Sequence, residues 1–144
     1  MIDRDLVIRK LVLIGTDLEA LRARARKPIE EYLRSDYDEL AAERLLERLI
    51  GRMIDVNYHL IVESGEVPPR DYHASFVTLG KLSILPVEFA GRLSAAAGLR
   101  NRIVHQYDEI DPEKIHEALT RAVSDVPEYA RHVRAFLDRG VSEE

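Results

Sequence analysis

Residues 86–107 read PVEFAGRLSAAAGLRNRIVHQY, and this stretch decides what fold the sequence predicts. Apolar side chains recur in it at spacings of three or four, which is the period of one face of an α-helix. These positions are Phe89, Leu93, Ala96, Leu99, Ile103 and Tyr107. Pro86 suits the first helical turn, where a missing N–H needs no partner. The pattern predicts one helix from about Pro86 to Gln106, with Tyr107 on its apolar stripe.

The same periodicity extends along most of the chain. It predicts further helices over about Asp5–Lys27, Asp38–Glu63 and Ala74–Leu82 and a final helix that ends near Asp138. Gly65 and the pair Pro68-Pro69 indicate a loop over Ser64–His73. Asp111 is the expected N-cap of the final helix and Pro112 its first residue, whereas Pro127 predicts a kink or a break near residues 124–126. We therefore expect a single domain over residues 1–144, an all-α up-down bundle of four to five helices.

Composition narrows the class of protein. The 144 residues contain no cysteine, which excludes thiolate nucleophiles, disulfides and cysteine-bound metals. No apolar stretch approaches the length of a membrane span, and the first residues do not resemble a signal peptide, so we expect a cytoplasmic protein without membrane contact. The formal net charge of -5 argues against broad electrostatic binding of nucleic acid. Any contact with RNA is therefore expected to be local.

Residues 100–107 concentrate the reactive side chains of the chain. Arg100 falls in the middle of the apolar stripe, where a leucine would be expected. An unpaired guanidinium there needs an anion, a ligand or a subunit boundary, because burying an unpaired charge is costly. Asn101 and His105 are four residues apart and share a neighbouring face. A surface pair or a packed histidine is the simpler explanation of this spacing, and the position of Arg100 adds some support to the functional interpretation.

A second set of polar residues shares one face of the helix predicted over residues 38–63. Its members are Arg44, Arg48, Arg52, Asp55 and His59. Such a ridge is usually a solvated face of ion pairs. The functional interpretation is that the ridge faces the helix of Arg100, with Asp55 orienting Arg100 or Asn101 and His59 contributing a donor.

Metal chemistry finds little support in the sequence. Glu113 and His116 have the Glu-x-x-His spacing of dimetal helical bundles, but a second copy of that spacing is missing. His73, His116 and His132 are expected to be surface or capping residues. We expect no metal and no cofactor.

Residues 100–107 resemble the Arg-Asn-x-x-x-His-x-Tyr signature of HepT-like toxins, which belong to the HEPN superfamily of all-helical ribonucleases. Arg100, Asn101, His105 and Tyr107 occupy its fixed positions. Further likeness extends over about residues 40–120. It is carried by Ile54 to His59, Gly65, Pro68, Pro69, Tyr72, Phe76, Leu85, Pro86 and Ile110 to Glu113.

This resemblance implies a metal-independent endoribonuclease toxin whose active site lies in the cleft of a homodimer, with 2′,3′-cyclic phosphate and 5′-hydroxyl products. It also implies a type II-like or type VII toxin–antitoxin system, in which an MntA-like nucleotidyltransferase adenylylates Tyr107. The attached AMP would exclude RNA by its bulk and negative charge. The simpler interpretation of Tyr107 is a packed aromatic ring with its hydroxyl at the solvent edge.

The chemistry of RNA fits these side chains. The 2′-hydroxyl attacks the adjacent phosphate, so the protein need only move protons, orient groups and stabilise charge. His105 would be general base or acid, Arg100 and Arg102 would bind the phosphate, and Asn101 would hold His105 or a phosphate oxygen. The alternative is a non-catalytic module that binds a nucleotide or a nucleotidyltransferase through the same cleft.

Overall fold

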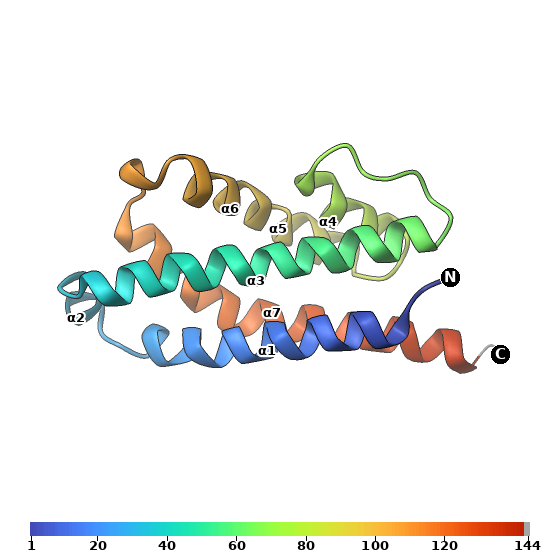
Figure 1. Ribbon diagram of the computed structural model, residues 1–144, viewed down its shortest axis with the longest axis horizontal. Helices are drawn as coiled ribbons and strands as arrows, with labels where there is room; N and C mark the ends of the chain where they lie inside the picture. The colour runs from blue at the N-terminus through green and yellow to red at the C-terminus, as the bar shows by residue number, and fades with distance from the viewer. Residues whose placement is uncertain (143–144) are drawn as a thin grey trace.

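The computed structural model describes residues 1–142, which form an all-α bundle (Figure 1). This confirms the expected fold class. The elements in the described part are α1 Arg4–Ala25, α2 Ile29–Leu33, α3 Asp36–Glu63, α4 Tyr72–Lys81, α5 Val87–Leu93, α6 Ala95–His105, the 3-10 turn η1 Tyr107–Glu109, and α7 Pro112–Ser142. In this part of the chain, no helix combines the length and the apolar character that crossing a bilayer requires.

Three long helices form the body of the bundle. Helices α1, α3 and α7 pack against one another, and α4, α5 and α6 lie along the other side of α3 (Figure 1). Leu21, Leu60 and Leu119 have no solvent exposure in the core between the long helices. Since α3 touches α1, α4, α6 and α7, it is the element that positions the motif helix relative to the rest of the fold.

A buried polar network ties α7 to α3 and α4. The Tyr129 hydroxyl donates to Asn57 Oδ1 at 2.6 Å, and Asn57 Nδ2 donates to Ser75 Oγ at 3.1 Å. Ser75 Oγ in turn donates to the carbonyl of Tyr72 at 2.7 Å. Burial raises the pKa of Tyr129, so its hydroxyl stays neutral and acts as a donor. The three polar side chains satisfy one another inside the core, which makes this crossing point specific.

The final helix begins as expected but does not break. Asp111 Oδ1 accepts from the Glu113 amide at 2.9 Å, which confirms Asp111 as the cap. Of the predicted kink or break near residues 124–126, the break is wrong, because α7 continues through Pro127, whereas a kink stays a prediction. Val126 and Tyr129 are buried on either side of the proline, and their packing against the bundle compensates for the hydrogen bond that proline cannot make.

The predicted helix over residues 86–106 is two helices. It divides at Ser94, which separates α5 from α6. The Ser94 hydroxyl donates to the Gly91 carbonyl at 2.5 Å, and a serine that bonds the preceding turn in this way bends or interrupts a helix. This division and the unexpected short helix α2 raise the helix count above the four to five expected.

Candidate active site

Arg100 lies on the side of α6 that faces α3 and α4. Its guanidinium carbon is 5.5 Å from the centre of the Tyr72 ring. The Nε atom is buried and has no hydrogen-bond partner, and the side chain makes no ion pair within residues 1–142. Arg100 thus lies on the inward side of α6 as expected, and the anion, ligand or subunit boundary expected to meet its charge is not supplied by the described residues of one chain. Such a guanidinium keeps its donors available for an anion.

Two residues that the sequence did not single out for a role create the space for Arg100. A Cβ atom at Gly51 of α3 would lie 3.4 Å from Arg100 Nε, in ordinary van der Waals contact, so the guanidinium packs directly against this glycine and a side chain larger than alanine would compete with it for space. The aromatic face of Tyr72 attracts the positive charge from the other side. The available signal was a lone glycine inside an otherwise regular helical pattern, which usually has a packing reason.

Asn101 and His105 lie exposed on α6, on the same face as expected from their spacing. Neither side chain makes a hydrogen bond within the described residues. His105 ends the helix, and the Gln106 amide closes it by donating to the Arg102 carbonyl at 2.7 Å. An imidazole in this place is accessible to a large substrate and can exchange protons with it.

Tyr107 does not belong to the apolar stripe. The helix ends at His105, and the chain turns at Gln106 into η1, so the periodicity that assigned Tyr107 to the stripe no longer applies. Its side chain is 66% exposed. The simpler interpretation, a packed ring with only its hydroxyl at the surface, is therefore wrong. The phenol is open to solvent two residues after His105.

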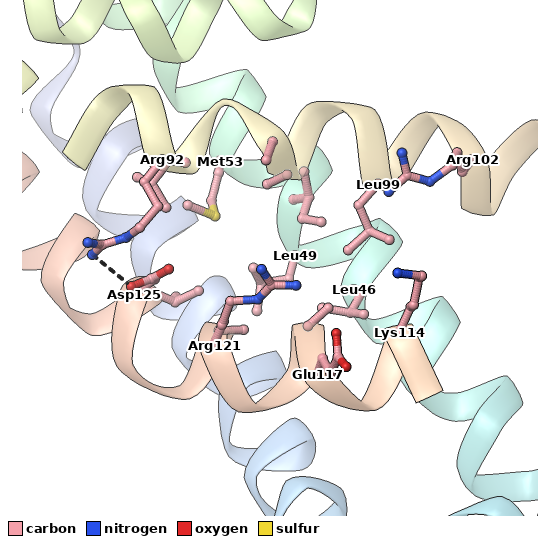
Figure 2. A pocket seen from close by; sticks show the side chains of 17 residues that line it. Leu46, Leu49, Met53, Arg92, Leu99, Arg102, Lys114, Glu117, Arg121 and Asp125 are labelled. Carbon is pink, nitrogen blue, oxygen red and sulfur yellow. Dashed lines mark hydrogen bonds and ion pairs between the residues drawn. The ribbon is translucent and has the colours of Figure 1, made fainter. Parts of the chain in front are cut away.

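Arg102 projects away from Arg100. Two residues along a helix turn the side chain by about 200°, so the two guanidiniums lie on opposite sides of α6. Arg102 lines a pocket of about 320 Å³ between α6 and α7, with α3 at its floor (Figure 2). The expectation that both arginines would hold one phosphate is therefore not met within a single chain.

The polar ridge of α3 faces α1 rather than the motif. Arg48 and Arg52 both pair with the buried carboxylate of Asp17, at 2.5 and 2.8 Å. Asp55 pairs with Lys10 at 3.1 Å.

His59 also turns toward the N-terminal helix. Its Nε2 accepts from the Asp3 amide at 2.9 Å, just before α1 begins. The expected positions of Asp55 and His59 beside Arg100 are thus wrong within one chain, because α1 occupies that side of α3. Arg44 is exposed and pairs with Glu47 on its own helix.

Two of the remaining histidines pack against aromatic rings. His116 lies 5.0 Å from the Tyr32 ring and His132 lies 5.7 Å from the Phe89 ring, measured between ring centres. His73 is exposed at the start of α4. Within residues 1–142, no three side chains of the metal-binding types lie together.

Comparison with known proteins identifies the family. The profile of the ribonuclease HepT-like family matches residues 3–133. The chain belongs to the ribonuclease HepT-like family. A tRNA nuclease HepT of Aphanizomenon flos-aquae (strain 2012/KM1/D3) is 34% identical over 128 residues, which are 89% of this chain and 87% of that protein. The family resemblance carried by residues 100–107 is thereby confirmed.

Solved structures of two bacterial proteins share the fold. The cytosolic protein YutE of Bacillus subtilis superimposes with a TM-score of 0.83 at 18% identity, over 96% of this chain and 93% of that one. A tri-AMPylated HEPN toxin of Shewanella oneidensis, solved in complex with an MNT antitoxin, gives 0.84 at 18% identity, over 92% and 99%. This HepT-like chain thus has the helical arrangement of those proteins along nearly its whole length.

Proposed function

We propose that this HepT-like protein is a metal-independent endoribonuclease toxin that works as a homodimer and is neutralised by a nucleotidyltransferase antitoxin. Arg100 binds the scissile phosphate, His105 transfers protons, and Asn101 holds His105 or a phosphate oxygen. The nuclease class is supported by the relative named as a tRNA nuclease. The antitoxin is supported by the HEPN toxin solved with an MNT partner.

The observation that carries this proposal is the unpaired guanidinium of Arg100. Its charge has no partner within the described residues, and Tyr72 and Gly51 hold it in place. A phosphate gains negative charge as its fifth bond forms, so a fixed guanidinium binds the transition state more strongly than the ground state.

The reaction needs two proton transfers. A base removes the 2′-hydroxyl proton, the 2′-oxygen bonds to phosphorus, and the bond from phosphorus to the 5′-oxygen breaks as an acid protonates that oxygen. One imidazole is poorly placed to serve both sides of the phosphate. A second copy of the chain would bring its own His105 to the same cleft, which is why the proposal includes a homodimer.

Cleavage in the presence of a chelator tests the proposed activity. We expect the purified protein to cleave RNA in EDTA and to leave 2′,3′-cyclic phosphate and 5′-hydroxyl ends, because the nucleophile is the 2′-hydroxyl of the substrate. Mass spectrometry of the products reads both ends. Cleavage that requires an added divalent ion would overturn metal independence. RNA or nucleotide binding without any cleavage would favour the non-catalytic module.

Sedimentation tests the shared cleft. The proposal expects a dimer of about twice 16.5 kDa at micromolar concentration. A strictly monomeric mass in an active preparation would contradict it.

Modification is expected at Tyr107. Its exposure leaves the hydroxyl accessible to a nucleotidyltransferase, and the attached AMP would place negative charge next to His105. After incubation with the partner nucleotidyltransferase and ATP, intact mass should show added AMP, and the modified protein should lose RNA cleavage. Tyr107→Phe should stay unmodified, whereas Tyr37→Phe, which changes an even more exposed tyrosine far along the chain, should be modified normally. AMP found on Tyr107→Phe would refute this assignment.

A further inference from the structure

The groove between α6 and α7 has an apolar floor and a charged rim. Helix α6 packs on α3 and α4 and α7 packs on α1, α2 and α3, so a space opens between α6 and α7 with α3 beneath it. Leu46, Leu49 and Leu99 line its floor, and its volume is about 320 Å³, at the small end of the range for ligand pockets. Figure 2 shows polar side chains from both walls around this apolar surface.

Positive charge dominates the rim. Arg102 of α6 and Lys114 and Arg121 of α7 make no side-chain hydrogen bond or ion pair within residues 1–142. Arg92 differs, because Asp125 holds it at 3.0 Å and a second carboxylate lies nearby. Glu117 is the one unpaired carboxylate that lines the described groove.

Three unpaired cations and the one unpaired carboxylate of Glu117 give this rim a net positive charge, in a chain whose formal net charge is -5. Binding of a further anion among the cations would reduce their mutual repulsion. An apolar floor next to an anion site matches a nucleotide, whose base has an apolar face and whose phosphate is charged.

We propose that this groove binds one unstacked nucleotide of the RNA substrate, adjacent to the nucleotide that is cleaved. The base lies on the leucine floor, and the phosphate contacts Arg102, Lys114 and Arg121. Arg100 and Arg102 share one helix whose diameter with side chains is about 10 Å. An RNA strand that crosses α6 therefore reaches both sides of it. This inference rests on the proposed ribonuclease function and gives Arg102 a role apart from the scissile phosphate.

Charge removal tests the phosphate contacts. The probe is a fluorescent single-stranded RNA oligonucleotide, and both variants are made in the full chain carrying His105→Ala, so that binding is measured without cleavage. Lys114→Gln with Arg121→Gln should weaken binding at least about tenfold and lower the slope of log K against log salt by up to about 0.7, the value for one lost phosphate contact on a single strand. Lys81→Gln with Arg134→Gln removes the same charge from two exposed cations elsewhere and should change neither value appreciably.

Filling the groove tests the base contact. Ala122→Phe places a ring over the floor, and Ala95→Phe does so from the opposite wall if the first variant loses its helical circular dichroism. The RNAs of a test series each carry one abasic nucleotide, at a different position in each. The parent protein should bind one of these RNAs about tenfold more weakly than the intact RNA. The filled variant should bind that abasic RNA and the intact RNA with the same affinity.

The outcomes separate this inference from the proposed function. If the parent chain cleaves RNA but the groove double variant and the control double variant bind RNA with the same affinity, the groove is not a subsite and the nuclease assignment stands. If the parent chain fails to cleave but the groove variants alone weaken RNA binding, the subsite stands and the nuclease assignment falls. If an abasic nucleotide lowers the RNA affinity of the filled variant as much as that of the parent, the base does not enter the groove.

Discussion

Arg100→Ala should lower the rate of RNA cleavage by at least about 100-fold and leave the free energy of unfolding nearly unchanged. Removing one fixed donor from a developing oxyanion typically costs this much in rate. The stability effect is small because Arg100 makes no ion pair within the described residues, and its contact with the Tyr72 ring contributes only about 0.5–1 kcal/mol. Single-turnover cleavage and urea unfolding measure the two effects.

Two further variants sharpen this prediction. Arg100→Lys keeps the charge but loses the planar fork, so we expect it to recover only part of the lost rate. Arg134→Ala removes an exposed arginine of α7 and should change neither rate nor stability. If Arg100→Ala destabilised the fold by several kcal/mol while cleavage by the folded fraction continued, Arg100 would be a structural residue.

Asn57→Asp should destabilise the protein by about 3–5 kcal/mol at pH 7. Asn57 has no solvent exposure and lies between Tyr129 and Ser75. The substitution changes the shape very little but places a carboxylate there without a cation, and an uncompensated buried charge costs about this much. Urea unfolding at several pH values measures the effect.

The pH dependence identifies the cause. Burial raises the pKa of the introduced carboxyl in the folded state above its unfolded value of about 4. The free energy of unfolding of the variant is therefore least reduced below the pKa of the unfolded state. Above that pKa it falls by about 1.4 kcal/mol for each pH unit, until the carboxyl of the folded state also ionises. Asn101→Asp, on the exposed face of α6, should show almost no such dependence. A loss for Asn57→Asp that is independent of pH would contradict burial as its cause.

The long helices were predictable because their apolar periodicity continues over many turns. The helix boundaries at Glu63 and Pro112 follow from the residues that cap and break helices, and the structure has both. Helix α2 is only five residues long, too short for a period to emerge. The division at Ser94 depends on a hydroxyl that bonds its own backbone, and the residues on either side are good helix formers.

Part of the site was predictable for the same reason. Spacing along one helix placed Asn101 with His105 and singled out Arg100, and all of these are as expected. The neighbours of a helix in space do not follow from its own period, so Asp55 and His59 were assigned to the wrong partner helix.

Two other features of the site depend on contacts that the sequence does not reveal. The space at Gly51 for Arg100 is a contact between α3 and α6, two helices distant in sequence. Arg102 is separated from Arg100 because two residues along a helix rotate the side chain by about 200°. The position of Arg102 in one groove with Lys114 and Arg121 depends on how α7 packs.

His105→Ala provides the most direct test of the central claim, that the side chains of residues 100–107 cleave RNA by proton transfer. The measurement is the single-turnover rate of RNA cleavage in EDTA, with RNA affinity and circular dichroism recorded on the same sample. We predict a rate lower by about 100-fold or more with RNA binding and helical content retained, whereas His73→Ala, which removes an exposed histidine of α4, cleaves at the parent rate. Cleavage by His105→Ala at the parent rate would contradict the claim.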